Sequence, residues 1–309
     1  MSFEFRRQGL VWLEDTSTSP TTFYRLHTER EVNFNQTFKQ GNPKKRTLHS
    51  LNTLFEGSTI KESSPANFEF TLFMVDETTT HQHKPLDLLL NYNGNSLSTF
   101  NLYFVYSDYS PQVYYKIEKA VFTGGNFIIP RNGIMKVNLS GEGSKLSRIE
   151  GSFPGTDSNY DSTPSYAMSR QFEVTVGSDS LDNILGASLE VQNDISWTPN
   201  NTVQKSIAVT NAVNTTFPEN FVLTGRSLGG SIQQYVSKTD SASTSNLQTW
   251  DQNTTVRIQA GLSASNYQLD VNMSNACSFT NRANFGELFT QNYDYRLMKS
   301  ADLNTYFTY

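Results

Sequence analysis

The side chains best suited to bind a metal ion are two histidines that lie two positions apart. His81 and His83 flank Gln82, and two imidazoles at this spacing on an extended segment can share one zinc ion. The other histidines, His27 and His49, and the carboxylates fall at no spacing that would complete a ligand set. We therefore expect the histidine pair to lie in a solvated loop, and we predict that the protein holds no metal and no other cofactor.

A short glycine-rich segment offers a second possible chemistry, which is phosphate binding. Residues 141–145 read Gly-Glu-Gly-Ser-Lys, but the spacing of a Walker motif is missing and no helical pattern follows, so we interpret the segment as a turn or bulge. The sequence contains no Gly-X-Ser-X-Gly, His-Glu-X-X-His or calcium-loop pattern. Scattered carboxylates leave glycosidase chemistry open, but no spacing singles out a catalytic group, and we predict that the chain is not an enzyme.

Three consecutive cations follow a turn signal early in the chain. Lys44, Lys45 and Arg46 come directly after the run Gly-Asn-Pro and could touch DNA phosphates. A solvated hairpin tip and a contact with an acidic neighbouring subunit are the alternatives. The whole chain has a formal net charge of −5, so it lacks the basic excess typical of proteins that wrap nucleic acid. We name these three residues as candidate inter-subunit or inter-ring contacts.

Cysteine content and hydropathy limit the remaining classes of protein. The single cysteine, Cys277, excludes an internal disulfide framework and a multi-cysteine metal site, and we expect it to be a small buried strand residue. No apolar run approaches the roughly 20 residues of a membrane-spanning helix. We therefore expect no membrane partner.

The elements that position these residues are mostly strands. Apolar and polar residues alternate in many segments, for example where Phe68, Phe70, Leu72 and Met74 share one face. Such alternation is typical of strands that are buried on one side only. The sequence therefore predicts a mainly β fold.

Two short segments depart from this alternation. Residues 85–92 begin with proline and carry leucines on one stripe, which predicts a helix. Residues 230–236 occupy a comparable place later in the chain, where Ser231 as a cap and a short apolar stripe predict a second helix. Glycine- and asparagine-rich runs at 124–126 and 130–133 predict turns.

The pattern of strands occurs twice along the chain. Three pairs of segments match in the same order, 31–38 with 190–197, 65–68 with 218–221, and 137–148 with 271–282. The offset between partners shortens along the chain, as expected for a second copy with shorter loops. A length of 309 residues also favours about two domains.

We therefore predict a tandem duplication of one β domain. Residues 1–150 form the first domain, residues 151–168 form a linker rich in Gly, Pro and Ser, and residues 169–309 form the second domain. Each domain contains one short helix.

The order of these features resembles the tail tube proteins of long-tailed bacteriophages, a family that includes the inner tubes of contractile tails and secretion machines. The stretch from Phe68 to Tyr92, a strand followed by a helix, carries most of the resemblance. The other features that carry it are an N-terminal arm, a strand over 32–38, an exposed hairpin around 41–46 and closing strands through 137–140.

The resemblance implies a fold and a structural role. Each copy would be a β-sandwich or partial barrel whose strands join those of neighbours in a continuous barrel around a channel. Single-copy tube proteins form stacked hexameric rings, so three two-copy chains would close one ring with pseudo-sixfold symmetry. The implied partners are further copies of the chain, a tape-measure protein, and baseplate or terminator proteins. DNA would pass through the lumen without specific binding, in a phage tail that is assembled in the bacterial host cytoplasm.

Two alternatives remain at this point. The chain could be a baseplate or tail-terminator component built on the same domain, which stops at one ring where a tube protein polymerises. It could also be a tandem carbohydrate-binding β-sandwich that uses Trp12, Trp197 and Trp250 as stacking platforms.

Overall fold

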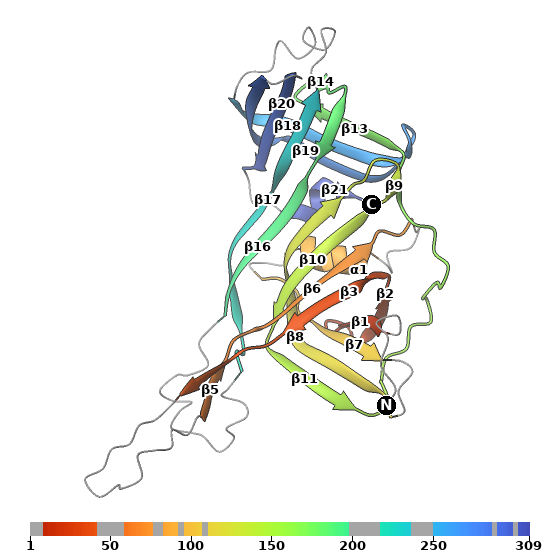
Figure 1. Cartoon of the computed structure of the whole chain (residues 1–309), viewed down its shortest axis with the longest axis vertical. Helices are drawn as coiled ribbons and strands as arrows, with labels where there is room; N and C mark the ends of the chain where they lie inside the picture. The colour runs from red at the N-terminus through yellow and green to blue at the C-terminus, as the bar shows by residue number, and fades with distance from the viewer. Residues whose placement is uncertain are drawn as a thin grey trace, which may run out of the picture.

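The computed structural model describes most of the chain, and its elements are almost all antiparallel strands (Figure 1). The described residues are 9–41, 59–76, 83–91, 96–106, 111–197, 217–235, 250–285, 289–298 and 302–309. The prediction of a mainly β fold is therefore confirmed. We refer below to the N-terminal half, residues 9–150, and to the C-terminal half, residues 168–309.

The N-terminal half contains eleven strands and one helix among its described residues. In chain order they are β1 (Gly9–Asp15), β2 (Thr22–Leu26), β3 (Thr28–Asn35), β4 (Phe38–Gly41), β5 (Thr59–Ser63), β6 (Ala66–Phe73), α1 (Lys84–Leu90), β7 (Phe100–Tyr106), β8 (Val113–Ile128), β9 (Gly133–Ile134), β10 (Lys136–Gly143) and β11 (Lys145–Glu150). The β4–β5 hairpin extends away from the body of the molecule (Figure 1).

The C-terminal half consists of strands and one short 3-10 helix in its described part. They are β12 (Met168–Ser169), β13 (Gln171–Val176), β14 (Asp179–Ser180), β15 (Ile184–Ala187), β16 (Leu189–Trp197), β17 (Phe221–Tyr235), β18 (Trp250–Ser263), β19 (Asn266–Phe285), β20 (Phe289–Leu297), η3 (Leu303–Tyr306) and β21 (Phe307–Thr308).

Strand pairing closes on itself in the N-terminal half. β1 pairs with β2 and β7, β7 pairs with β8, β8 with β10, β10 with β6, and β6 with β3. Because β2 runs on into β3 through His27, the pairings form a closed circuit. β11 continues β10 along the edge of β8.

The C-terminal half contains a circuit of the same kind. β13 pairs with β18, β18 with β19, β19 with β20, and β20 with β17. β17 pairs with β16 and β15, and the chain between β15 and β13 passes through β14, which pairs with β13. A sheet that closes in this way leaves few unpaired strand edges.

A short seam joins the two circuits into one large sheet. In β8, the four residues from Gly124 to Phe127 pair with the four residues from Leu189 to Gln192 in β16, antiparallel. Two chain segments that are distant in sequence thereby become neighbouring strands. Figure 1 shows the resulting sheet running from β3 through β8 and β16 to β17.

The core lies on one face of this sheet and continues through both halves. The apolar alternation of β6, for example, buries Phe68, Phe70 and Leu72, and β16 buries Leu189 and Val191 in the same way. One hydrophobic cluster includes residues from both halves. At roughly 25 cal/mol per Å² of apolar surface removed from water, this burial is the main source of stability.

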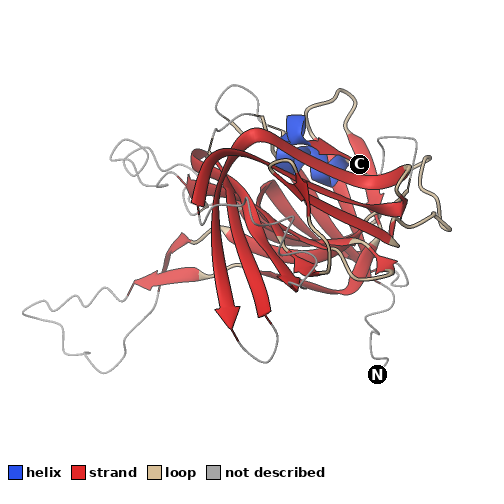
Figure 2. Ribbon diagram, turned by 90° about the horizontal axis from the view of Figure 1, so that it is seen from above, coloured by secondary structure: helices blue, strands red, loops and turns tan. Residues whose placement is uncertain are grey.

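Helix α1 covers the buried face of the sheet where the halves meet. Its first turn contains Pro85, and its leucines at 86, 88, 89 and 90 are buried. Figure 2 shows α1 close to the C-terminal helix, on one side of the curved sheets. The helix predicted over residues 85–92 is therefore confirmed, although α1 ends at Leu90 and Asn91 is already extended.

Side chains of the C-terminal half hold the last turn of α1. Arg226 in β17 donates to the carbonyl oxygens of Leu89 and Leu90 at 3.0 and 2.8 Å. Asn193 in β16 donates to the carbonyl oxygen of Leu89 at 3.2 Å and accepts from the Arg226 Nε at 2.7 Å. The last carbonyls of a helix have no partner within the helix, so the second half supplies the C-terminal cap of the first half's helix.

The helix predicted over residues 230–236 is wrong in its described part, because β17 continues to Tyr235. Ile232 and Gln234 are buried while Ser231 and Gln233 are exposed, which is the two-residue period of a strand. The segment is paired on both sides, to β15 and to β20. Two flanking strands outweigh a weak capping signal.

The turn predicted at 124–126 is also wrong. Gly124 and Gly125 lie inside β8 and belong to the seam. A Cβ on Gly125 would collide with Leu89 Cδ2 of α1, and one on Gly124 would lie 2.7 Å from Ser140 Oγ. These glycines make room for close packing, whereas the turn predicted at 130–133 is present.

Residues 151–167 contain no regular strand, but they are packed against the N-terminal half. The Phe153 ring lies 5.1 Å from Trp12 and 5.3 Å from Tyr103. Asp157 accepts the backbone N–H of Arg25 at 2.8 Å. The segment therefore follows a fixed path along the surface.

Candidate functional site

The candidate functional site is a continuous polar face on the large sheet. Eight strands follow one another in the order β3, β6, β10, β8, β16, β17, β20 and β19. One row of paired residues runs from Asn138 through Asn126, Glu190, Gly229 and Arg296 to Ser278. Directly paired residues point to the same side of a sheet, so this row crosses the seam on a single face.

The strands position this face by simple alternation. In β16, Glu190, Gln192 and Asp194 are exposed, while Val191 and Asn193 between them are buried. β6 exposes Asn67 and Glu69 in the same way. Two exposed apolar residues lie on this side, Ile128 opposite Lys136 and Val222 opposite Ser196. We define the polar face by its outward polar side chains: Glu29, Glu31, Asn33, Asn35, Asn67, Glu69, Thr71, Asn126, Lys136, Asn138, Ser140, Glu142, Glu190, Gln192, Asp194, Ser196, Thr224, Ser227, Ser231, Gln233, Ser278, Thr280, Arg282, Asn292, Asp294 and Arg296.

The polar face carries an excess of negative charge. Among the outward side chains just defined, seven are carboxylates and three are cations. Two of the three cations are ion-paired, Lys136 with Glu29, and Arg282 with Asp294 at 2.7 Å. A surface of amides, hydroxyls and excess carboxylates repels phosphate and offers no basic groove for nucleic acid.

The predicted cationic contacts cannot be placed on this geometry. Lys44, Lys45 and Arg46 lie outside the described residues, in the segment between β4 and β5. Their role in contacts between subunits or rings stays a prediction.

The histidine pair is divided between described and undescribed parts of the chain. His81 lies outside the described residues, while His83 is buried at the start of α1. The His83 Nε2 is 3.0 Å from the carbonyl oxygen of Val75, and its ring packs edge-on against Tyr309 at 4.9 Å. The prediction of a solvated loop is wrong for His83. No group of three potential metal ligands occurs in the described ranges.

The glycine-rich segment 141–145 has a structural role. Gly141 and Gly143 lie in β10, where added side chains would collide with the Phe68 ring and with Ile117. The register against β8 shifts between Ser140 and Gly141, which confirms the predicted bulge. The segment thus belongs to a strand whose glycines admit neighbouring side chains.

Cys277 and the tryptophans also have packing roles. Cys277 is buried in β19 with its Sγ 3.6 Å from Met273 Sδ, as predicted, and burial raises the pKa of its thiol to about 12. Trp12 packs on the 151–167 segment, Trp197 donates to Glu142 at 2.7 Å, and Trp250 stands exposed at the start of β18. The three rings therefore share no stacking platform.

Sequence reasoning missed the polar face itself. The signal was present in segments such as 190–194, where acidic or amide residues occupy every second position. Alternation alone, however, does not reveal which strands become neighbours, and the seam joins residues more than sixty positions apart.

The fold and this face define a structural β protein, in which one side of a sheet forms the core and the other forms an extended acidic surface. The comparison with protein families then gives a specific answer. The family model described as the Bacteriophage Baseplate Tube Protein Family matches residues 1–306, so the chain belongs to that family. It is a structural protein of the phage tail and baseplate tube, and thus a component of the virion.

Two further observations accompany this result. None of the curated proteins compared matches the chain. In the described part of the chain, no helix combines the length and the apolar character needed to cross a membrane.

Proposed function

We propose that three copies of this chain close a ring with pseudo-sixfold symmetry, and that the polar faces of the copies line a channel through which DNA passes. The observation that carries the proposal is the seam between β8 and β16, because it joins two circuits of strands edge to edge while keeping one polar side. A junction of this kind can be repeated between chains.

The similarity of the two circuits supports a tandem duplication. Taken in chain order, β1, β3, β6, β7, β8 and β10 have the same neighbours as β13, β16, β17, β18, β19 and β20. The matched residues Val32 and Val191 lie in β3 and β16, and Phe68 and Phe221 lie in β6 and β17. We retain residues 1–150, 151–168 and 169–309 as the proposed first domain, linker and second domain.

One of the three sequence matches does not correspond to equivalent strands. Val137 lies in β10, next to β6, whereas Val271 lies in β19, whose partners are β18, β20 and β21. In the order of pairing, β20 takes the place of β10. The proposal of a duplication therefore rests on the circuits and on the first two matches.

The size of the sheet is suitable for a channel. Three copies of an eight-strand run give a barrel of 24 strands. With strands about 4.8 Å apart and tilted by about 35–45°, such a barrel is about 45–50 Å across between backbones. That width accommodates duplex DNA together with the side chains on both walls.

The charge of the polar face suits the passage of DNA. Carboxylates such as Glu69, Glu142, Glu190 and Asp194 repel phosphates along the whole path. A basic wall would hold DNA by releasing counterions and would slow its movement. We therefore assign DNA the role of a cargo that passes without specific binding, and we propose no catalytic activity.

The description of the family names the baseplate. We therefore propose that the chain forms a ring or a short stack of rings in the baseplate, in preference to a long tube. Such a ring would contact the tail tube, the tape-measure protein and other baseplate proteins, after assembly in the host cytoplasm. Lys44, Lys45 and Arg46 are proposed to contact the adjacent ring.

Electron microscopy and native mass spectrometry of the purified protein test the ring. We expect particles of three times 34.9 kDa. Each chain should contribute two lobes, one for each circuit of strands, so that six lobes surround an open channel with an underlying threefold symmetry. A protein that stays monomeric across concentrations and salt conditions, or that forms closed particles without a channel, would contradict the proposal.

The charge of the channel has a separate test. Glu69→Lys/Glu190→Lys reverses two charges on the polar face, and we expect the purified ring to retain DNA in a salt-dependent manner. The control is Glu118→Lys/Glu150→Lys, which makes the same change of charge in the paired strands β8 and β11, at residues outside the polar face. Equal DNA retention by both variants would show that the polar face does not meet DNA.

A further inference from the structure

We propose that successive chains of the ring join by one specific pairing, in which β3 of one copy lies antiparallel to residues 281–285 of β19 in the next. The pairing repeats between chains what the seam does within a chain. This inference rests on the proposed ring and names the two strand edges that close it.

The internal seam shows how such an edge becomes available. β7 covers one edge of β8 only as far as Ala120, where it pairs with Phe100. Beyond that point the same edge is open, and β16 occupies it at Gly124–Phe127. The other edge of β8 is covered throughout by β10 and β11.

β19 offers the same arrangement in the C-terminal half. β18 covers one edge of β19 as far as Thr280, which pairs with Trp250. The next five residues, Asn281 to Phe285, pair with β20 on the other edge. Within the described residues no strand pairs with the outer edge of this segment, which is the place that β16 takes on β8.

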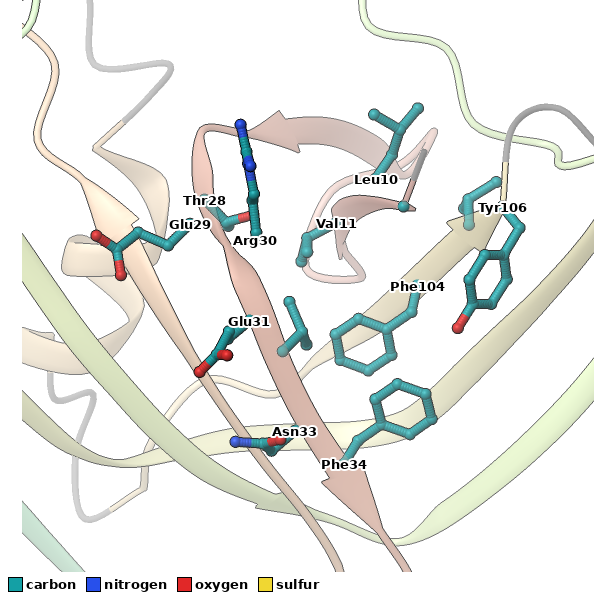
Figure 3. Close-up of a pocket in the computed structure, with 13 residues that line it drawn as sticks. Leu10, Val11, Thr28, Glu29, Arg30, Glu31, Asn33, Phe34, Phe104 and Tyr106 are labelled. Carbon is teal, nitrogen blue, oxygen red and sulfur yellow. The ribbon is translucent and has the colours of Figure 1, made fainter. Parts of the chain in front are cut away.

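β3 offers the complementary edge in the N-terminal half. β6 is its pairing partner among the described strands, on one edge. The opposite edge borders a groove of about 490 Å³, whose far wall is formed by the ends of β1 and β7 (Figure 3). β16, the equivalent strand, has β17 on one edge and β8 on the other. An open edge of this kind is a template for a strand from another chain.

The bulge in β3 limits the length of the proposed junction. The register against β6 shifts between Thr28 and Val32, and regular pairing resumes from Val32 onward. A junction from Glu31, the last residue before regular pairing, to Phe34 uses four residues, as the internal seam does. Figure 3 shows Glu31 and Asn33 on one side of β3 and Phe34 on the other, so the polar face would continue across the junction.

Charge complementarity favours one register. If Glu31–Phe34 pair antiparallel with residues 281–284, Asn33 lies opposite Arg282, and Glu31 is its diagonal neighbour. Arg282 is 77% exposed, although it also pairs with Asp294 at 2.7 Å. Glu31 places a carboxylate on this part of the β3 edge, whereas Glu29 is ion-paired with Lys136. A diagonal pair remains within reach of a long side chain.

Disulfide trapping in the full-length protein tests this junction. Directly opposed residues in antiparallel strands have Cα atoms about 4.5–5.5 Å apart, which suits a disulfide. Asn33→Cys/Arg282→Cys should therefore give covalent trimers under mild oxidation, seen on non-reducing gels. The native Cys277 is buried, and each single-cysteine variant controls for its participation.

A matched control uses the next strand of the same row. Glu69 in β6 pairs directly with Asn33, so Glu69→Cys/Arg282→Cys moves one thiol a full strand away from the edge, by about 4.8 Å. We expect this variant to form rings without efficient cross-linking. Cross-linking of both pairs to the same extent would overturn the proposed register.

Charge exchange gives a second, independent measurement. Arg282→Glu places a new carboxylate beside Asp294 and, across the junction, beside Glu31. This variant should reduce the trimeric fraction in native mass spectrometry. Glu31→Arg/Arg282→Glu should restore it. Asp182→Arg/Arg282→Glu adds the same charge at an exposed site away from both edges and should not restore the ring.

The outcomes separate this inference from the proposed ring. Threefold rings without cross-linking of Asn33→Cys/Arg282→Cys would overturn the junction and leave the ring intact. A protein that is monomeric in every variant would overturn both.

Discussion

The two halves of the molecule share an order of strand pairing but differ in what fills them. The N-terminal half packs a helix and a group of phenylalanines, among them Phe68, Phe70, Phe100 and Phe122, inside its circuit. The described C-terminal half encloses mainly aliphatic residues together with hydrogen-bonded polar groups. Tyr293 donates to Gln234 at 2.7 Å inside it. The interiors diverge, whereas the polar face continues unchanged across the seam.

This difference shows that the two interiors are packed with different residues, whereas the strand edges and the outward polar side chains are alike in both halves. The halves are nevertheless coupled through α1. Arg226 and Asn193 hold its last turn, and the C-terminal residue Tyr309 donates to Asp87 at 2.6 Å. The C-terminal half therefore helps to hold the helix of the N-terminal half. The following predictions test the contrast between the two interiors and this coupling between them.

The largest effect on stability is expected from Leu89→Ala. Leu89 lies in α1, which is the one α-helix among the described residues and belongs to the N-terminal interior. Leu89 is fully buried and fills the space above Gly125. We expect a loss of about 3–5 kcal/mol in the free energy of unfolding, as for other large-to-small changes in a core, measured by urea denaturation.

A double variant sharpens this prediction. Gly125→Ala alone should destabilise the protein because its Cβ collides with Leu89 Cδ2. In the Leu89→Ala background the same methyl group enters the cavity, so Gly125→Ala should recover part of the lost stability. Additive losses in the double variant would show that these groups do not share one space.

The next effect tests the coupling between halves. Arg226→Met keeps the length of the side chain but removes the donors to Leu89 and Leu90, and leaves two carbonyl groups at the end of α1 without them. We expect a loss of about 2–3 kcal/mol, in the range for hydrogen bonds from a charged group. Arg131→Met, at an exposed arginine in the turn before β9, is the control and should change stability little.

A smaller effect is expected inside the C-terminal circuit. Tyr293→Phe removes the hydroxyl that donates to Gln234 and leaves that buried amide with one partner fewer. We expect a loss of about 1–2 kcal/mol without a change in the ring. A loss as large as that of Leu89→Ala would contradict the view that the second interior depends mainly on apolar packing.

The smallest effect concerns acid stability. Burial raises the pKa of Asp15, but hydrogen bonds from Lys84 and Ser17 outweigh it and hold the pKa below its ordinary value. A depressed pKa contributes stability above the unfolded value, near 4, and this contribution is lost as the pH falls through the folded value. The free energy of unfolding should therefore fall less between pH 7 and pH 3 in Asp15→Asn than in the unchanged protein. We expect the two decreases to differ by about 1 kcal/mol. Identical pH dependence would contradict the role of this ion pair.

Much of the fold could be predicted from the sequence because alternation is a local signal. The strand around Phe68 and the helix after Pro85 were predicted from spacing alone and are confirmed. The same local rules failed where a residue serves a distant neighbour. Gly124 and Gly125 look like a turn, yet they admit Leu89 and the side of β10.

The candidate site was less predictable, since it exists only after strands have been placed side by side. Glu69 and Glu190 belong to one surface because β6, β10, β8 and β16 are consecutive. No spacing in the sequence records that order. The second predicted helix failed for a related reason, since Ile232 is flanked by two strands that come from 184–187 and 289–297.

The seam between β8 and β16 has a consequence for the economy of assembly. In the proposed ring each chain supplies two lobes, one from each half, and fusion in one polypeptide holds them at a high effective concentration. Half of the six junctions in that ring would then form without the loss of translational freedom that separate molecules suffer on association. An odd number of lobes would also be excluded in the proposed ring, because each chain would contribute a pair. A neighbouring tail or baseplate protein that binds only one of the two kinds of lobe would then find three binding sites around the ring instead of six.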